Sequence, residues 1–454
     1  KETHSFNAGV VTADGGSIVL GTGSGDNASA AGNVLNIGTL NGSANFVVNT
    51  DAARGNSDKL NIAAANNSTA NTLKVNYDPY YTTAVKSGSL SGLTNIITAP
   101  AAVKFTALAT DWGAVQLTPA LKQNPDGSWD LAAVTEAAVT GASENTLTAA
   151  DSHQVIDDLW FDTVNSLSKR LGDLRVSQLS LAGNPASSTA PSVVKLAEDG
   201  VWARYMRATT RAGRGRKAEL NGNLLQVGYD KAFAVKNGTS YVGIAVDHLN
   251  GSSEYENGSG KAKGTSVALY HTWLGSKGHY YDVVLRQGHF SNDYALTDLS
   301  GTYSSADYGV NATTLSAEYG YRKNLAKGGW FEPQAEIIYG RLSSADYTTS
   351  KDWPVHVDGV NHFFTRFGFG LGRTTALGSY YFKASYYHDF GGAAGSVTFA
   401  DYRYDRTALR DWVELSLGGE AKLSKAASLY GEVTKYLGDR TNNLNLNAGI
   451  RWSF

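Results

Sequence analysis

The chain has 454 residues and a formal net charge of -2, with Gly 50, Tyr 25, Trp 9, Pro 8, Met 1 and Cys 0. The length predicts two or three structural units, and the balanced charge provides no overall field that would recruit nucleic acid. No run of about 18 apolar residues is present, which argues against a membrane-spanning helix. The lack of Cys excludes disulfides and thiolate metal sites.

Residues 1–150 are rich in Ala, Asn, Gly, Ser and Thr, and they contain short apolar clusters such as "NVLNIG" and "ANFVVNTD". Turn residues separate these clusters, a pattern that indicates a solenoid or a sandwich. The segment 113–134 predicts a hairpin around the turn at 124–127. Because Lys1 follows no Met and no apolar signal region, we expect a processed or shortened chain.

Residues 151–182 have a helical pattern, with Asp151 or Ser152 as a plausible N-cap. Apolar side chains recur at three- and four-residue spacing at Val155, Ile156, Leu159, Val164, Leu167, Leu171 and Leu174. Charged side chains surround them at Asp157, Asp158, Asp162, Lys169, Arg170, Asp173 and Arg175. Gly172 lies in the interior of this helix, where Gly destabilises the helix by about 1 kcal/mol relative to Ala. Its presence there indicates close approach of another backbone. Residues 183–192 are expected to form a loop.

Residues 200–454 alternate apolar and polar side chains, which is the period of β-strands. The expected strands are 200–211, 220–234, 238–251, 264–275, 278–292, 310–324, 329–343, 359–374, 378–391, 410–423, 427–437 and 444–454. Each is long enough for the roughly 9–11 tilted residues that cross a bilayer. Lipid requires all backbone polar groups to be paired, so the even number of strands predicts a closed transmembrane β-barrel.

The alternation also predicts which side chains face outward. In the last strand the apolar side consists of Leu444, Leu446, Ala448, Ile450, Trp452 and Phe454. The same parity turns four carboxylates inward, those of Glu332, Glu336, Glu414 and Glu420. A soluble sandwich or a lipocalin-like barrel would alternate as well. Strand length, Tyr and Trp near strand ends and the aromatic last strand favour the membrane barrel.

An isolated helix surrounded by charged side chains is expected in the aqueous lumen of such a barrel. There its Asp, Lys and Arg side chains can meet the inward-facing Glu and Lys of the strands. A helix about 10–12 Å wide would plug the pore. The alternative is an external helix packed on the N-terminal solenoid.

The segments "GVWARYMRA" (200–208), "LLQVGYDKAF" (224–233) and the closing "NAGIRWSF" resemble the translocator domain of monomeric (type V-a) autotransporters. Residues 45–77 resemble the last pertactin-like rungs of passenger β-helices, the autochaperone region. The resemblance implies an all-β fold, in which short right-handed parallel β-helix rungs precede a 12-stranded antiparallel transmembrane β-barrel with one luminal α-helix. Its three parts would be a passenger region at 1–150, a linker at 151–199 and the barrel at 200–454.

The function that this resemblance implies is an outer-membrane translocator. It would anchor and export its own N-terminal passenger, whose folding the autochaperone region would drive. Two alternatives remain open: a helix-plugged outer-membrane channel, and a surface-anchored adhesin. The barrel is expected in the bacterial outer membrane, with the passenger region exposed at the cell surface.

The helix segment 164–175 is similar to the linker helix of the serine-protease autotransporters of enteric bacteria. In that group an Asn-Asn bond is cut once, when the first Asn cyclises onto its own carbonyl with the help of luminal acids. The resemblance places the cyclising residue at Asn165, followed here by Ser166 where the group has a second Asn. The alternative is that Asn165 is simply a polar luminal residue. No other enzymatic activity is expected.

Several other motifs predict no chemistry. The segment 258–266 lacks Ser or Thr after Lys261 and is expected at a turn between strands, so it is not a phosphate loop. No metal or cofactor site is expected, and the nine His residues show no metal-ligand spacing. No G-x-S-x-G elbow occurs, so no serine-hydrolase centre is expected. The basic turn 211–217 is either a solvated loop or a contact for lipopolysaccharide phosphates.

The C-terminal strand suggests further partners. Leu446, Ile450, Trp452 and the terminal Phe454 resemble the signal read by the barrel-assembly machinery. We therefore expect four kinds of partner: outer-membrane lipid and lipopolysaccharide, that machinery, periplasmic chaperones and the chain's own passenger. No nucleic acid is expected, and the protein is expected to be a monomer.

Overall fold

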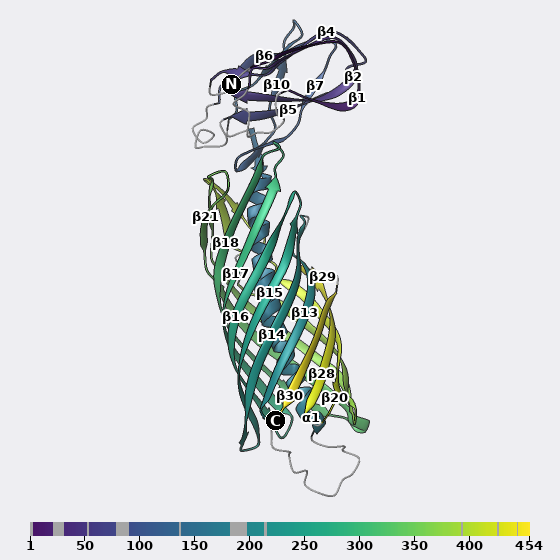
Figure 1. Ribbon diagram of the computed structural model, residues 1–454, viewed down its shortest axis with the longest axis vertical. Coiled ribbons are helices and arrows are strands. Elements are labelled where there is room, and N and C mark those ends of the chain that lie inside the picture. The colour runs from purple at the N-terminus through teal and green to yellow at the C-terminus, as the bar shows by residue number, and fades with distance from the viewer. Residues whose placement is uncertain are drawn as a thin grey trace.

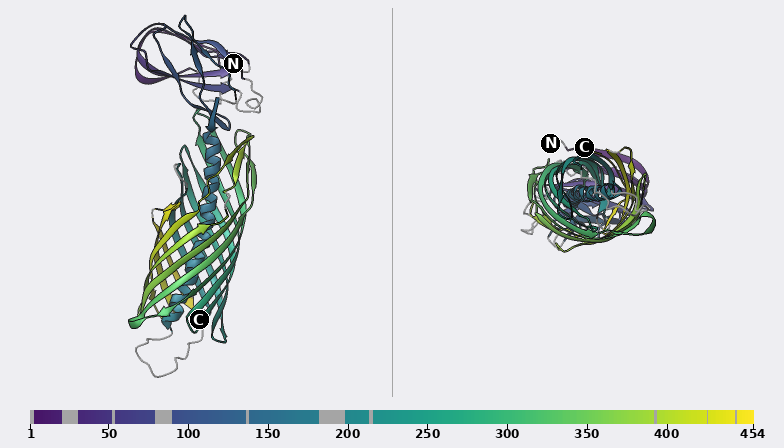
Figure 2. Two further views of the ribbon diagram at one scale, coloured as in Figure 1. Left: turned by 180° about the vertical axis from the view of Figure 1, so that it is seen from behind. Right: turned by 90° about the horizontal axis from the view of Figure 1, so that it is seen from below.

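The chain forms a long closed barrel with a smaller, mostly parallel β-structure beyond one end (Figure 1). A single long helix runs inside the ring of strands, as the view along the barrel shows (Figure 2). The C-terminus lies at the opposite end of the barrel from the N-terminal β-structure. The computed structural model describes residues 3–20, 31–51, 54–78, 90–135, 138–181, 198–212, 216–391, 394–424, 426–442 and 444–454.

The N-terminal region is built from stacked parallel strands, which confirms the pertactin-like expectation. Its strands are β1 (Ser5–Val19), β2 (Val34–Asp51), β3 (Asn56–Ser57), β4 (Lys59–Asn66), β5 (Asn71–Asp78), β6 (Leu93–Thr98) and β7 (Phe105–Ala107). Strand β2 pairs in parallel with β1, β4 and β5, while β4 continues to β6 and β5 to β7. Each rung therefore uses its neighbour as a template.

Side chains inside and outside these rungs stack in rows. Phe46, Leu60 and Leu73 are fully buried in one continuous apolar core. On the outer side Asn36 Nδ2 donates to Asn7 Oδ1 and Asn61 Nδ2 donates to Asn36 Oδ1, each over 2.8 Å. Such ladders keep the polar face of consecutive rungs in register.

A short stem follows the stacked rungs. It consists of β8 (Thr110–Trp112), β9 (Val115–Leu117), β10 (Leu121–Gln123), β11 (Ser128–Leu131) and β12 (Val139–Ala142). Strands β10 and β11 form the expected hairpin, whose turn closes when Gly127 N–H donates to Asn124 O over 3.0 Å. Gly127 has φ +87, which requires glycine. The earlier part of segment 113–134 instead joins β9 to β8 and β12.

The barrel consists of twelve long antiparallel strands in the described part of the chain. They are β13 (Gly200–Ala212), β14 (Ala218–Val235), β15 (Gly238–Tyr255), β16 (Gly258–Gly275), β17 (His279–Thr297), β18 (Tyr303–Tyr321), β20 (Gly329–Leu342), β23 (Val360–Thr375), β24 (Gly378–Asp389), β27 (Asp411–Lys422), β28 (Ala427–Gly438) and β30 (Asn445–Ser453). Strand β13 pairs with both β14 and β30, which closes the sheet. The segment 258–266 begins β16 and is not a turn, because β16 starts earlier than its apolar alternation indicates.

Alternation along these strands separates an apolar outer face from a polar inner face, as expected. Leu269, Leu285 and Leu315 are exposed on the outside, whereas Glu336 and Glu414 are buried inside. The strands β14 to β18 are longer than predicted. They continue beyond the apolar band, where their outward residues are polar.

Helix α1 (Glu144–Leu181) begins earlier than residue 151, with Ser143 as its N-cap. Ser143 Oγ accepts from Thr146 N–H over 3.3 Å. The expectation of Asp151 or Ser152 as N-cap was wrong, because residues 144–150 have no apolar periodicity and contacts with the stem hold that first part. The 38 residues span about 57 Å, more than the roughly 30 Å of a hydrocarbon core.

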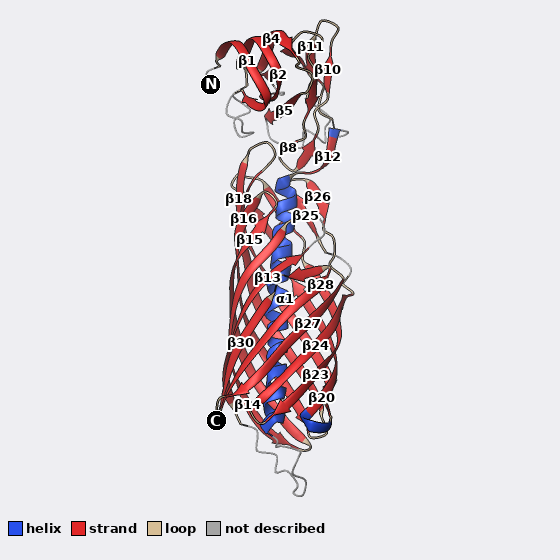
Figure 3. Cartoon of the chain, turned by 90° about the vertical axis from the view of Figure 1, so that its right-hand side faces the viewer, coloured by secondary structure: helices blue, strands red, loops and turns tan. Residues whose placement is uncertain are grey.

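At the end of the barrel nearer the N-terminal β-structure, the long connections fold into a small four-stranded sheet beside the upper part of α1 (Figure 3). Its strands are β21 (Ala345–Thr348), β22 (Pro354–Val357), β25 (Ser396–Phe399) and β26 (Tyr402–Asp405). The remaining short elements are β19 (Lys323–Asn324), the 3-10 helix η3 (Ala326–Gly328) and β29 (Arg440–Asn442). This sheet narrows the mouth of the barrel around the helix.

Candidate functional site: the occupied lumen

Ion pairs hold α1 where it enters the barrel. Arg216 Nη2 lies 2.8 Å from Glu144 Oε2, and Arg216 Nε lies 3.1 Å from Asp151 Oδ2. This arginine belongs to the basic turn 211–217, of which 213–215 lie outside the described residues. Of the two described arginines of this turn, Arg216 binds the helix and Arg211 pairs with Glu219 on β14.

A second set of charges lies about two turns deeper. Asp157 Oδ2 accepts from Arg406 Nη2 over 2.6 Å, and its other oxygen lies 3.9 Å from His362 Nε2. His362 Nδ1 lies 2.8 Å from Asp389 Oδ2. Residues from the helix, from β23, from the end of β24 and from the loop after β26 thus meet at one depth.

The ring of Trp160 fills the space between the helix and the wall. Its Nε1 donates to Thr314 Oγ1 over 2.8 Å, and the ring stacks on His362 with centroids 5.0 Å apart. A Cβ on Gly340 would lie 2.1 Å from Trp160 Cζ2, so glycine is required on β20 at this point. The wall and the helix are therefore fitted to each other.

Asn165 lies in a buried polar pocket formed by three strands. Its Nδ2 donates to Glu414 Oε2 over 2.7 Å and to Tyr436 Oη over 2.8 Å. Its Oδ1 accepts from Tyr387 Oη over 3.2 Å. Both ends of the amide are thus oriented by side chains of the barrel wall.

The residues that follow Asn165 are also fixed by the wall. Ser166 Oγ donates to Gln226 Oε1 over 2.9 Å, and Ser168 Oγ donates to Glu336 Oε1 over 3.1 Å. Glu336 is in turn paired with Arg366 over 2.8 Å. The Asn165–Ser166 peptide bond is therefore held on both sides.

Lys169 lies one turn further on and forms buried ion pairs with the wall. Its Nζ lies 2.6 Å from Glu432 Oε1 and 3.3 Å from Glu414 Oε1. It also donates to Thr434 Oγ1 over 2.5 Å. Asp162, about two turns before Lys169, accepts from Thr210 Oγ1 over 3.2 Å. Removing one partner of a buried pair costs about 3–5 kcal/mol, so these contacts define the register of the helix.

The lower end of α1 is described in less detail. Gly172 lies in the helix and is buried. The side chains of Arg170, Asp173 and Arg175 lie outside the described residues.

The other two inward carboxylates are also buried. Glu332 is paired with Arg322 and accepts from Gln334 Nε2 over 2.7 Å. Glu420 is buried on β27, as parity indicated. Glu336 and Glu414 bind described side chains of α1.

The stem is docked on the barrel through buried carboxylates outside the membrane-spanning strands. Asp111 Oδ2 accepts from Leu299 N–H over 2.9 Å and from Glu144 N–H over 3.2 Å, while Asn145 Nδ2 donates to Asp298 Oδ2 over 2.9 Å. Burial raises the pKa of Asp111 to about 7, although these two backbone N–H groups oppose the rise. This junction connects the stem, the helix and the β17–β18 hairpin.

The predicted assembly signal lies on the outer wall at the end opposite the stem. Leu446, Ile450, Trp452 and Phe454 are exposed to the extent of 48, 43, 53 and 64%. Phe454 N–H donates to Asp199 O over 3.0 Å, which joins the last strand to the start of the first.

Sequence reasoning identified the helix and the inward glutamates but missed most of their partners. Tyr387, Tyr436, Arg406 and Arg440 came to light only in the structure. The alternation of side chains along β24 and β28 could have predicted that the two tyrosines face inward. The two arginines lie outside the long barrel strands, where no periodicity points to them. Arg440 Nη1 lies 2.8 Å from Asp158 Oδ1.

Two further observations concern the described residues as a whole. They contain no group of three or more His, Asp or Glu side chains arranged to hold a metal ion. None of their helices combines the length and the apolar character that crossing a bilayer requires.

A closed sheet with an apolar outside, and a charged interior occupied by the chain's own helix, defines an integral membrane β-barrel joined through its lumen to an external domain. Residues 201–434 match the family described as Autotransporter beta-domain, and residues 11–133 match the family described as Pertactin. The chain belongs to the autotransporter family.

Three curated relatives are similar to this chain. The BrkA autotransporter of Bordetella pertussis is 28% identical over 431 residues, which cover 92% of this chain and 40% of that protein. The Pertactin autotransporter of Bordetella parapertussis is 29% identical, covering 65% of this chain and 31% of that protein. Serine protease EspP of Escherichia coli is 30% identical over 54% of this chain and 17% of that protein. The chain thus spans two fifths or less of the length of these relatives.

Solved structures are similar to the chain as well. The beta domain of the Bordetella autotransporter BrkA is 26% identical with a TM-score of 0.49, covering 57% of this chain and all of that one. The translocator domain of NalP from Neisseria meningitidis is 12% identical with a TM-score of 0.49, covering 65% of this chain and 98% of that one.

Membership of this family identifies the membrane in which the barrel lies and the function of the barrel. It lies in the bacterial outer membrane as the translocator of its own passenger, and the β-structure beyond its mouth is exposed at the cell surface. The end of the barrel that carries the stem is therefore the outer end.

Proposed function

We propose that residues 34–135 act as an autochaperone region for the passenger that this translocator exports. The observation that carries the proposal is the parallel pairing of β2 with β1, β4 and β5. A rung folded outside the barrel offers its open edge as a template for the next one and makes backsliding unfavourable.

Deleting residues 34–135 from a full-length protein is expected to impair passenger display. The measurement is surface labelling of the passenger on intact cells, with heat-modifiable migration as a control for barrel assembly. Undiminished display with an intact barrel would contradict the proposal.

We further propose that Asn165 carries out a single self-cleavage. Asn165 Nδ2 attacks the carbonyl carbon of the same residue, so an Nδ2–C bond forms while the bond from that carbon to the Ser166 nitrogen breaks. Glu414 accepts a proton from Nδ2, and a proton ends on the Ser166 amine. The products are a chain that ends in a succinimide at position 165 and a fragment that begins at Ser166.

The pocket geometry supports this chemistry. Glu414 Oε2 accepts from the attacking nitrogen over 2.7 Å, and its other oxygen lies 3.3 Å from Lys169 Nζ, which orients the carboxylate. Tyr387 Oη donates to Asn165 Oδ1, where negative charge would develop as Nδ2 loses its proton. Beyond this one turnover we propose no enzymatic activity for these residues.

The mass of the purified protein from membranes tests the cleavage. Wild type is expected to yield a fragment beginning at Ser166, and Glu414→Gln is expected to remain uncut because its side chain cannot take up the proton. Glu420→Gln, on the same strand, is the matched control and should be cut like wild type. An intact wild-type mass would exclude self-cleavage.

Two other functions compete with this assignment. In a helix-plugged channel the helix would have to leave the lumen, which the buried pair of Lys169 and Glu432 opposes. A surface adhesin would need an exposed recognition patch on residues 1–150, and that region is poor in aromatic and basic side chains.

We propose as partners the barrel-assembly machinery, periplasmic chaperones and outer-membrane lipid including lipopolysaccharide. The outward row of Leu446, Ile450, Trp452 and Phe454 at the inner end of the barrel supports the first of these. The polar outer wall above the apolar band supports the last.

A further inference from the structure

The outer wall of the barrel changes character along β16, β17, β18, β20 and β23. Its lower outward residues are apolar and exposed to the bilayer, and they include Val267, Leu269, Leu285, Leu315, Tyr339 and Phe363. The next outward residues toward the outer end are polar or basic on every one of these strands. The height of this change corresponds to the headgroup region of the outer leaflet.

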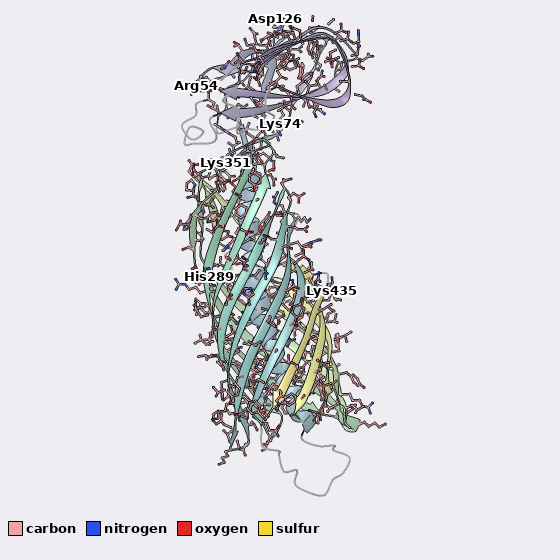
Figure 4. All side chains as sticks on the ribbon, viewed as in Figure 1. Arg54, Lys74, Asp126, His289, Lys351 and Lys435 are labelled. Atoms are coloured by element: carbon pink, nitrogen blue, oxygen red, sulfur yellow. The ribbon has the colours of Figure 1, made fainter. Side chains whose placement is uncertain are left out.

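The polar residues form one continuous row across the strands. Thr265 lies opposite His289, and His289 lies opposite Asn311. Thr313 then lies opposite Arg341. Lys263 precedes Thr265 by two positions on β16 and faces the same side, and Figure 4 shows His289 on the outer wall below Lys351.

Two grooves hollow this part of the wall, with volumes of about 990 and 540 Å³. Lys261, Lys263 and His289 line the larger groove. Arg341 lines the smaller one together with Asn311, Thr313 and Asn361. Strand β18 borders both grooves, so they adjoin each other.

The cations in these grooves are available for a ligand. Within the described residues the side chains of Lys263 and Arg341 take part in no ion pair or hydrogen bond, and both residues are exposed. His289 Nδ1 lies 3.0 Å from Asn311 Oδ1, which leaves the amide Nδ2 of Asn311 free to donate. The site therefore offers two charged donors and neutral donors between them.

Negative charge lies further from the membrane. Asp293 and Asp307 face each other across β17 and β18, above His289 and Asn311. They would repel a phosphate placed beside them, which confines an anion to the lower row next to the apolar band.

We propose that Lys263, Arg341 and the donors between them bind the phosphorylated sugar headgroup of a lipopolysaccharide molecule of the outer leaflet. Its acyl chains would lie over Leu285, Leu315 and Tyr339 directly below. Lys263 and Arg341 are three strand spacings apart across the sheet and four residues apart along the strands. Their Cα atoms are therefore about 19 Å apart, and their long side chains can close around a headgroup with two phosphates. This inference rests on the proposal above that lipopolysaccharide is a partner, and it names the site.

The test is a titration of the full chain in detergent with diphosphoryl lipid A, followed by native mass spectrometry. Each removed cation is expected to weaken binding about fivefold, as for one Lys or Arg near an anionic surface, so a Lys263→Gln/Arg341→Gln double variant should bind about 25-fold more weakly. Arg341→Lys should retain most of the affinity. Arg373→Gln, at the inner end of β23, is the matched control and should bind like wild type.

Three results would overturn the proposal: unchanged lipid A binding by the double variant, equal competition by phosphatidylglycerol, or displacement of lipid A by millimolar inorganic phosphate. Passenger display measured in the same variants separates this site from the export function. Display is expected to be normal in the double variant, because neither side chain contacts the helix. Failure of display in wild type would count against export, whereas normal display with unchanged lipid binding would remove only the site.

Discussion

At the scale of single residues, the protein depends on polar groups removed from water. Asn165 and Lys169 have their donors satisfied by the barrel wall, and a change at either one leaves a buried partner without its hydrogen bond. Asp111 is different, because one of its oxygens has no hydrogen-bond partner in the described part of the chain. That carboxylate sits beside Asp298, and the like charge favours its protonated form.

The raised pKa of Asp111 predicts a pH dependence of the junction. Between about pH 4 and 7 the folded junction holds a proton that an unfolded chain releases. The stability of the stem is therefore greatest at the acidic end of this window, and it falls as the pH rises through about 7. The loss is about 4 kcal/mol over the whole window.

Amide hydrogen exchange at β8 and β9, corrected for intrinsic rates, measures this effect. Asp111→Asn should remove most of the pH dependence, since its amide does not titrate. Asp14→Asn changes an exposed carboxylate of β1 and should leave the wild-type profile in place. Equal protection of wild type at pH 5 and pH 8 would show the prediction to be wrong.

At the scale of elements, the helix and the wall are fitted to each other over most of the barrel length. Trp160 needs Gly340, and Asp157 needs Arg406 from a loop that lies far away in the sequence. The apolar side chains of the helix, such as Leu159 and Leu167, are buried through contacts with the barrel wall. Its helical state is therefore a consequence of the contacts in the lumen.

This dependence predicts how the barrel conducts ions. A chain of residues 144–454 keeps the helix, and a chain of residues 183–454 lacks it. In planar bilayers the shorter chain is expected to conduct several-fold more, because an element about 10–12 Å wide leaves the lumen. Equal conductance of the two chains would mean that the helix does not block the pore.

At the scale of the whole molecule, closure of the sheet is the decisive feature. Strand β30 must find β13, which is more than 200 residues earlier in the chain, and Phe454 N–H completes that seam through Asp199 O. Every backbone group in contact with lipid is paired only after this step. The last strand is therefore important for assembly as well as for stability.

Phe454→Ser is expected to reduce insertion into the outer membrane several-fold, since it removes an aromatic side chain that is exposed at the end of the seam. The measurement is the yield of heat-modifiable barrel in outer-membrane fractions. Leu377→Ser alters an even more exposed apolar residue in a turn and serves as a control that should insert normally. Equal yields of Phe454→Ser and wild type would contradict a role of the terminal aromatic.

The sequence by itself determined what depends on local periodicity. Alternation predicted the strands, their outward sides and inward Glu336 and Glu414, because a strand that contacts lipid on one face and water on the other must repeat every two residues. The spacing of apolar residues identified the helix as far as it is regular. The start of the helix at Glu144 was not predicted, because residues 144–150 are helical through their contacts with the stem.

Only the tertiary structure decided which groups meet. Asn165 and Glu414 are separated by 249 positions, and Asp157 and Arg406 also by 249. No local pattern encodes such pairs, because the tilt and register of a closed barrel decide which strand faces a given turn of the helix. The lipid-facing row from Lys263 to Arg341 has the same origin: each strand contributes one ordinary polar residue, and only their common height makes a site.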